Sequence, residues 1–82
     1  MILVDIYIPA VDETYDFMLD ENVETEKIID EITGMITKKM KSGSIGHASE
    51  FLLYSMVTEK MLERRKSLQQ NGVQDGTKLM LV

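Results

Sequence analysis

His47 is the residue in this 82-residue chain whose type most directly suggests chemistry. It is the single histidine, and an imidazole can act as a general acid or base near neutral pH. However, the sequence contains no cysteine for it to activate, and His47 lies in a stretch rich in glycine and serine, residues 42–49. We therefore interpret His47 as a loop residue and expect no catalytic role for it.

Two further patterns could in principle bind ions. Asp12, Glu13 and Asp16 supply carboxylates of the kind that bind calcium, but their spacing does not match a calcium-binding loop. Residues 42–47 contain two glycines but lack the Gly-Lys-Ser/Thr ending of a phosphate-binding loop. The sequence thus predicts no enzyme activity, no metal site and no cofactor.

The charges of the chain are divided unevenly. Residues 1–31 contain ten acidic residues and one basic residue, a net charge of −9, whereas residues 32–82 contain eight basic and four acidic residues, a net charge of +4. A chain with an overall charge of −5 repels phosphate backbones, so we expect no nucleic-acid partner. The basic run at residues 64–66 is interpreted as a solvated turn in preference to a site for an anionic surface.

Nothing in the sequence predicts insertion into a membrane. No apolar run reaches the roughly 18–20 residues that span a bilayer. The apolar start is interrupted by Asp5, and no basic region precedes it, so it does not resemble a signal peptide. We expect a cytoplasmic protein, and the lack of cysteine agrees with a reducing compartment.

The spacing of the apolar residues predicts a hairpin at the beginning of the chain. Residues 2–8 and 14–20 each alternate in the way typical of a strand with one buried face. Pro9 cannot donate a ladder hydrogen bond and ends the first strand. The side chains expected to point inward are Ile2, Val4, Ile6 and Ile8 in the first strand and Tyr15, Phe17 and Leu19 in the second.

Residues 25–40 have the apolar spacing of an α-helix. The buried stripe is formed by Ile28, Ile29, Ile32, Met35, Ile36 and Met40. Thr25 or Asn22 could cap the beginning of the helix, and lysines near its end interact favourably with the helix dipole. Gly34 costs roughly 1 kcal/mol relative to alanine inside a helix, which we interpret as a close approach to the sheet. Met35 and Met40 are expected to fill gaps in the core.

The second half of the chain predicts three more strands. Residues 51–57 are apolar on both faces, a short strand follows around Met61, and residues 77–82 form the last strand. Residues 67–71 can make one helical turn, which Gly72 closes, and Gly76 leads into the last strand; both glycines suit the left-handed conformation. The order predicts a single α+β domain, residues 1–82, with a mixed four- to five-stranded sheet and one α-helix, about residues 25–40, packed on one face.

This order, together with the final segment KMLERRKSLQQNGVQDGTKLMLV, resembles the ubiquitin-like β-grasp family. The spacing within that segment matches the second half of ubiquitin without a gap. The residues that carry the likeness are Leu62, Leu68, Gly72, Val73, Leu79, Met80, Leu81 and Val82. The likeness covers the whole chain in element order and roughly its last thirty residues in detail.

Within that superfamily, the opening ILVDIYIPAVDETYDFMLDENV is similar to the small YukD/EsaB proteins, which are ubiquitin-like components of type VII secretion systems in Gram-positive bacteria. The likeness consists of an initial V-D-I strand and a YDF.LDEN second strand ahead of the helix. It implies a bacterial, cytoplasmic, non-catalytic accessory or regulatory protein. Its implied partner is a protein of the secretion machinery.

The end of the sequence bears on how such a protein would act. Ubiquitin and the sulfur carriers ThiS and MoaD react through a tail that ends in Gly-Gly, whereas this sequence has no Gly-Gly pair and ends in Val82. We therefore expect non-covalent protein–protein contact. Two alternatives stay open: a carrier or modifier activated at its C-terminal carboxylate, and a homo-oligomeric structural domain such as a homodimer.

The predicted contact site is an apolar patch on the sheet. If Leu79 and Leu81 point inward, then Met80 and Val82 face outward with Lys78, and the alignment with ubiquitin places Met56 beside Met80 and Val82. These positions correspond to the apolar recognition patch of ubiquitin. Exposed apolar groups that gather on a sheet often mark a contact site, although scattered exposure is the simpler alternative. The full predicted patch is Met56, Met80, Val82, Leu52 and Tyr54.

Overall fold

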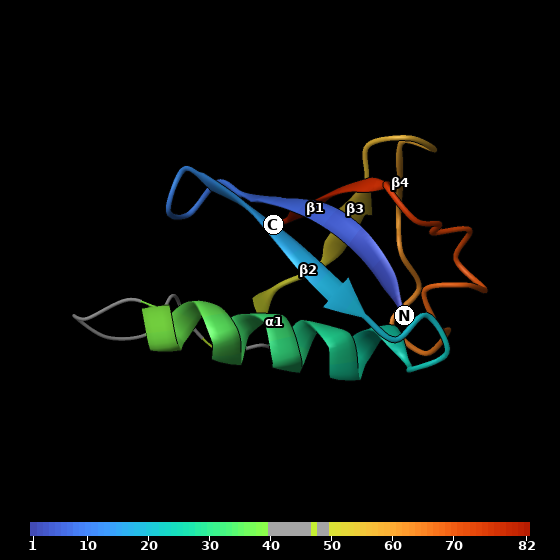
Figure 1. Ribbon diagram of the computed structural model, residues 1–82, viewed down its shortest axis with the longest axis horizontal. Coiled ribbons are helices and arrows are strands. Elements are labelled where there is room, and N and C mark those ends of the chain that lie inside the picture. The colour runs from blue at the N-terminus through green and yellow to red at the C-terminus, as the bar shows by residue number, and fades with distance from the viewer. Residues whose placement is uncertain (40–46, 48–49) are drawn as a thin grey trace.

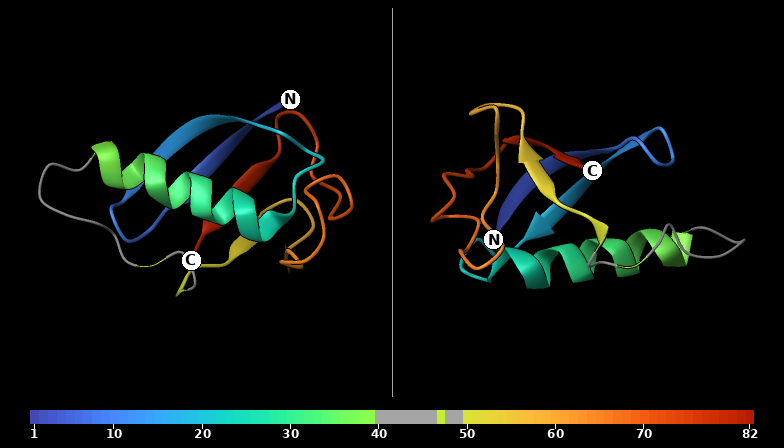
Figure 2. Two further views of the ribbon diagram at one scale, coloured as in Figure 1. Left: turned by 90° about the horizontal axis from the view of Figure 1, so that it is seen from below. Right: turned by 180° about the vertical axis from the view of Figure 1, so that it is seen from behind.

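The computed structural model describes residues 1–39, 47 and 50–82. Its elements are β1 (Ile2–Ile8), β2 (Glu13–Leu19), α1 (Thr25–Lys39), β3 (Leu53–Ser55), β4 (Lys60–Met61) and β5 (Lys78–Leu81). The strands form one five-stranded sheet in the order β2-β1-β5-β3-β4. α1 crosses one face of this sheet, so the molecule has two layers (Figures 1 and 2). This is the mixed sheet with one packed helix that the sequence predicts.

The sheet is mixed because its two central strands run parallel. β1 and β5 pair in parallel, whereas β1–β2, β3–β5 and β3–β4 are antiparallel. The β1–β2 hairpin turns at residues 9–12, where Asp12 has a φ of 51°. Aspartate tolerates this left-handed conformation better than most residues do. The Tyr7 hydroxyl donates a hydrogen bond of 2.9 Å to Oδ1 of Asp12 and so ties β1 to the turn.

The core fills the space between the sheet and α1. The inward positions of β1 and β5 and the apolar stripe of α1 are buried, as the alternation and the helical spacing predict. Phe17 and Leu19 of β2 are buried with them, and Tyr15 and Met35 are partly buried against the core. Met40, the last predicted member of the stripe, lies outside the described residues. At roughly 25 cal/mol per Å² of apolar surface, this burial is the main stabilising term of the fold.

Gly34 does not have the role predicted for it. The residue is exposed, and a Cβ atom built there would meet nothing within 4 Å, leaving aside its chain neighbours and the helix's own backbone. The sheet therefore does not approach the helix closely at this point, and the prediction of close packing was wrong. In contrast, Gly72 and Gly76 have φ values of 80° and 85°, which confirms the predicted left-handed turns.

The start of α1 also differs from the prediction. Thr25 does not cap the helix, because the helix begins at Thr25 itself and its hydroxyl donates to the carbonyl of Lys66, 2.6 Å away. The carbonyl of Glu24 accepts the bonds that close the first turn. Asn22, the alternative cap, donates its backbone N–H to Asp20. The hydroxyl of Thr25 thus joins α1 to a turn 41 residues away, a contact that no local pattern indicates.

The third strand is shorter than predicted. Residues 51–57 were expected to be strand, but β3 comprises three residues, and Leu52 and Met56 pair with the strand next to it just beyond its ends. The predicted loop at residues 42–49 lies outside the described residues except for His47, which is exposed. In the part of the chain that the structure describes, no helix is long and apolar enough to cross a bilayer.

Candidate functional site

The face of the sheet opposite α1 is the candidate site. Leu53 and Ser55 of β3 and Leu79 and Leu81 of β5 are buried toward the helix. Because successive side chains of a strand point to opposite faces, their neighbours lie on the other side of the sheet. We call this surface the outer face; its residues are Leu3, Asp5, Tyr7, Thr14, Asp16, Met18, Leu52, Tyr54, Met56, Met61, Lys78, Met80 and Val82.

Four large side chains form a line across the outer face. Tyr7 of β1 pairs with Met80 of β5, Met80 pairs with Tyr54 of β3, and Tyr54 pairs with Met61 of β4. Side chains at paired positions of adjacent strands lie side by side on one face. We call Tyr7, Met80, Tyr54 and Met61 the apolar row. Its end member, Met61, is 49% exposed, so the row reaches the surface at the β4 edge.

The five residues of the predicted patch all lie on the outer face, but not in the predicted arrangement. Met56 donates its backbone N–H to Lys78, whereas Val82 and Leu52 exchange two backbone hydrogen bonds of 2.7 and 2.9 Å. Met56 is therefore a neighbour of Met80 and not of Val82, which lies four residues, or roughly 13 Å, further along β5 from Lys78. Leu52 and Val82 form one cross-strand pair, and Met56 lies on the opposite side of the apolar row.

Two members of the apolar row were not predicted as site residues. Tyr7 belongs to β1 and Met61 to β4, and each meets the patch only through strand pairing. The parallel β1–β5 register joins residues 73 positions apart, which apolar spacing along the chain cannot reveal.

The outer face is hollowed beside the apolar row. A shallow depression of about 320 Å³ is lined by Asp5, Tyr7, Thr14, Met56, Lys78 and Leu79. It combines an aromatic ring, a flexible thioether and two opposite charges. Such a depression suits a single apolar side chain of a partner, with a polar group at its rim.

The charged residues of the outer face lie on three neighbouring strands, Asp16 on β2, Asp5 on β1 and Lys78 on β5. Asp5 pairs with Asp16 on β2 and with Lys78 on β5. A hydrogen bond with Asp5 raises the pKa of Asp16 above its ordinary value, and the repulsion between the two carboxylates adds to the effect. The pKa of Tyr7 is also raised, chiefly by its hydrogen bond to Asp12.

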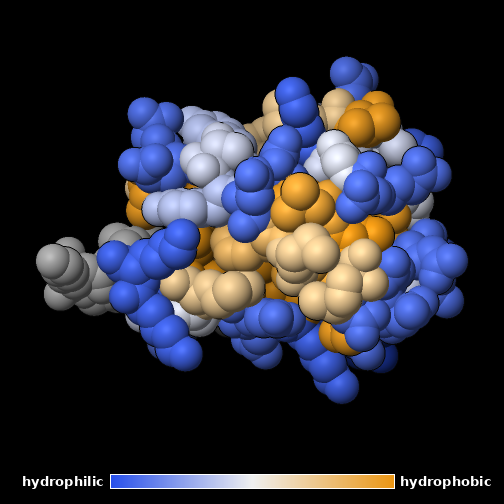
Figure 3. Space-filling model, in the orientation of Figure 1, coloured by the Kyte–Doolittle hydropathy of each residue, from blue (hydrophilic) through white to orange (hydrophobic). Residues whose placement is uncertain are grey.

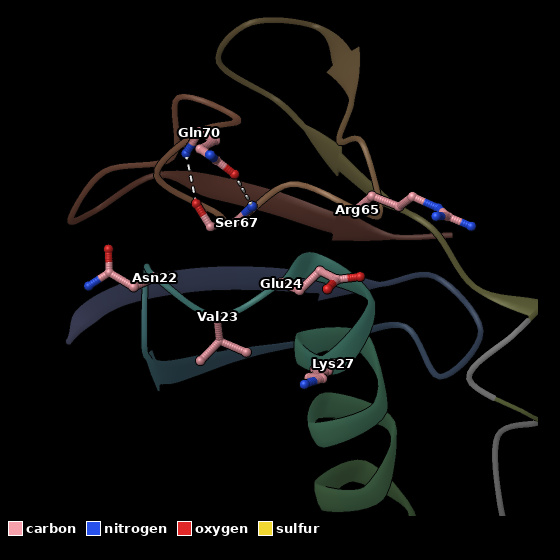
Figure 4. Close-up of a pocket in the computed structure, with 7 residues that line it drawn as sticks. All are labelled: Asn22, Val23, Glu24, Lys27, Arg65, Ser67 and Gln70. Atoms are coloured by element: carbon pink, nitrogen blue, oxygen red, sulfur yellow. Dashed lines mark hydrogen bonds between the residues drawn. The ribbon is translucent and has the colours of Figure 1, made fainter.

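A larger depression, of about 460 Å³, lies where α1 begins (Figure 4). Its polar groups do not converge. Ser67 and Gln70 bond to each other twice, at 3.0 and 3.1 Å, while Lys27 and Arg65 extend in different directions in Figure 4. Glu24 adds a negative charge among them. The arrangement offers no cluster of cations for an anion and no nucleophile beside a base.

The basic run at residues 64–66 is largely engaged within the chain. The Arg64 guanidinium donates to the carbonyl of Phe51 at 2.6 Å and lies 3.8 Å from a carboxylate oxygen of Glu26. The ammonium group of Lys66 lies 2.9 Å from the Glu63 carboxylate. Arg64 therefore connects its turn to Phe51, which precedes β3, and to α1.

Comparison with known proteins gives a clear result for the fold. No family model matches the sequence, and no curated protein sequence matches it. Solved structures do match: the N-terminal ubiquitin-like domain of the 4931431F19Rik protein has a TM-score of 0.77 and 22% identity, over 99% of this chain and 72% of that chain. The ubiquitin of Caldiarchaeum subterraneum has a TM-score of 0.72 and 17% identity, over 98% of this chain and 89% of that one.

A third similar structure is ATBAG1, solved in complex with HSP70, with a TM-score of 0.74 and 18% identity. The match covers 100% of this chain and 40% of that one. Identities at this level establish the architecture and leave the activity open. The chain has the ubiquitin-like β-grasp fold.

Proposed function

We propose that this chain is a non-catalytic ubiquitin-like protein that acts by non-covalent contact with another protein through its outer face. The observation that carries the proposal is the apolar row with its adjoining depression. Exposed apolar side chains that gather on a sheet are typical of contact sites, and methionine adapts its shape to a partner. Tyrosine contributes contact area at a small entropic cost.

The exposure of the surrounding side chains supports the same proposal. Leu52 is 38% exposed, Met56 48% and Val82 41%. Folding does not require apolar residues at these positions, because the buried neighbours already complete the core. Asp16, Asp5 and Lys78 lie in register across β2, β1 and β5, next to the apolar row, so charged groups adjoin the apolar contact area, as polar groups adjoin the apolar centre of a protein interface.

We propose further that the protein is a cytoplasmic accessory or regulatory component of a bacterial type VII secretion system. The support is the similarity of the opening segment to YukD/EsaB proteins, which falls on β1 and β2. In this proposal the outer face docks on a protein of the secretion machinery.

A pull-down with matched variants tests both parts. The tagged chain is recovered from native cells and washed under native or denaturing conditions before mass spectrometry. We expect secretion-system proteins in the native wash alone, and their loss with Met80→Glu and with Met56→Glu. Gly34→Glu, which adds the same charge on the exposed side of α1, should retain them.

Three results would contradict the proposal. If the folded variants Met80→Glu, Met56→Glu and Gly34→Glu recovered the partner proteins equally well, the outer face would not be the contact site. If the proteins recovered in the native wash were unrelated to secretion, the secretion role would be overturned, whereas the proposal of contact through the outer face would stand. Partners that survive denaturation, together with a mass shift at Val82, would instead indicate a carrier or modifier; sedimentation across a concentration series distinguishes a homodimer.

A further inference from the structure

The β2 edge is a second surface, separate from the apolar row. β2 and β4 are the two edge strands of the sheet. β4 has two residues, one of which is Lys60, and short or lysine-bearing edges resist pairing with other chains. β2 has seven residues, pairs with β1 over its full length and contains neither proline nor lysine. It therefore offers the longer template for an added strand.

The hydrogen bonds of β1 show which backbone groups of β2 point away from the sheet and are free to pair. Asp5 directs its N–H to Thr77, and the carbonyl of Leu3 accepts from Gly76, both on the β5 side of β1. In an antiparallel pair, the residues opposite them, Asp16 and Met18, then make no ladder bond with β1 and direct their backbone groups outward. Thr14 follows by the same alternation. No described residue donates to or accepts from these outward groups outside the strand ladders.

Apolar surface adjoins the edge on the side of α1. Figure 1 views the molecule from the side of β2, and in the same orientation Figure 3 shows apolar side chains over β2 and between it and the helix. Tyr15 and Met35 are partly buried against the core, and the rings of Tyr15 and Phe17 lie with their centroids 6.2 Å apart, tilted by 54° to each other. Alternate apolar side chains of an added strand would cover this surface.

The charged residues around the β2 edge indicate what kind of strand could bind to it. β2 carries Glu13 and Asp16 with no basic residue, and Asp12 and Asp20 flank it. A second copy of β2 would set acidic strand against acidic strand, and like charges at opposed positions are destabilising. On the helix side of this edge, Lys39 already supplies a cation, 4.4 Å from the ring centroid of Tyr15. Basic side chains of an added strand therefore belong on the outer-face side, next to Asp16.

We propose that the β2 edge binds an extended basic segment of a partner protein, which adds a strand to the sheet and pairs with the backbone of Thr14, Asp16 and Met18. Alternate residues of the segment are basic, toward Asp16, and apolar, toward the surface between β2 and α1. The site is separate from the apolar row, because its contacts are backbone hydrogen bonds at the opposite edge of the sheet from Met61.

The test uses the full chain labelled with ¹⁵N and two synthetic seven-residue peptides, one of alternating valine and lysine and one of alternating valine and glutamate. With the lysine peptide, we expect shifted resonances and slowed hydrogen exchange at the amides of Thr14, Asp16 and Met18. The glutamate peptide should not bind. Asp16→Lys should weaken binding roughly tenfold, the scale of an exposed charge pair replaced by a repulsion, and Asp16→Asn should weaken it less.

Asp30→Lys is the matched control, because it changes the net charge equally at an exposed position of α1. It should bind the lysine peptide within about twofold of the wild-type chain. Equal losses for Asp16→Lys and Asp30→Lys would overturn the proposal in favour of general charge attraction. Binding without slowed exchange at the three amides, or no binding of the lysine peptide at millimolar concentration, would also overturn it. If hydrogen exchange at these amides slowed with increasing protein concentration in the absence of peptide, the edge would instead bind a second copy of the chain.

Discussion

The side chain of Asn71 makes several hydrogen bonds, from which we predict that it stabilises the second half of the fold. Its side-chain amide donates to the carbonyls of Ser67 at 2.9 Å and Glu63 at 3.0 Å, and lies 3.1 Å from the hydroxyl of Thr25. Its Oδ1 accepts from the N–H of Glu63 at 2.8 Å. One half-buried side chain thus joins the turn before Gly72 to the beginning of α1, 46 residues away.

The size of the effect follows from the number of bonds. The amide has two N–H groups and one carbonyl, so Asn71→Ala removes about three hydrogen bonds, each with a net value of about 1 kcal/mol. Water replaces part of them, because the side chain is half-buried. We expect the free energy of unfolding to fall by about 2 kcal/mol and the melting temperature by about 8–16 °C in a domain of this size.

Urea unfolding followed by circular dichroism measures this loss. Asn71→Asp keeps the acceptor but sets a carboxylate against the carbonyls of Ser67 and Glu63, so it should destabilise the fold at least as much as alanine at neutral pH. Gln70→Ala is the matched control: Gln70 is exposed in the same turn, and its side chain accepts one bond, from Ser67. If Asn71→Ala and Gln70→Ala had equal effects, the reasoning on Asn71 would be refuted.

Two further predictions concern α1 and the outer face. Gly34→Ala should raise the free energy of unfolding by up to about 1 kcal/mol, because the site is exposed with open space for a Cβ; calorimetry that shows a loss would contradict the open site. Asp5→Asn should lower the pKa of Asp16 toward its ordinary value, since Asp5 raises it, and an NMR titration of the side-chain carboxyl carbon measures this. Because the folded state raises the pKa of Asp16, this carboxyl stabilises the fold below its unfolded-state pKa, and that contribution is lost as the pH rises through its folded-state pKa. If Asp5→Asn left the titration of Asp16 unchanged, the pairing of the two carboxyls would be contradicted.

Local patterns in the sequence were sufficient for most of the fold. Alternation in β1, β2 and β5 and the helical spacing in α1 assign the buried apolar side chains of these elements to their face, because burial of one face is what these patterns reflect. The alternation in β5 also places Met80 on the outer face. Gly72 and Gly76 were predicted correctly for a similar reason, since a left-handed turn constrains one residue at a time.

The missed features depend on contacts between distant parts of the chain. Tyr7 joins the apolar row through the parallel β1–β5 register, and the hydroxyl of Thr25 finds its partners in the turn at residues 66–71. The relative position of Met56 and Val82 depends on the β3–β5 register, which a one-dimensional alignment did not fix. The interpretation of Gly34 failed because an exposed helical glycine and a packed one have the same local sequence context.

The composition of the outer face changes from one edge of the sheet to the other, and this gradient bears on how a partner would be oriented. At β2 the outward side chains are Thr14, Asp16 and Met18, whereas the β3–β5 region presents five apolar or aromatic residues and the cation Lys78, which pairs with Asp5 of β1; the five are Leu52, Tyr54, Met56, Met80 and Val82. Folding constrains the inward positions of these strands much more than the outward ones, so the gradient is not a by-product of core formation. A partner with a basic end and an apolar end would therefore bind in one orientation, since reversal would set its basic residues against the methionines and Lys78 and leave the carboxylate of Asp16 without a counter-charge from the partner.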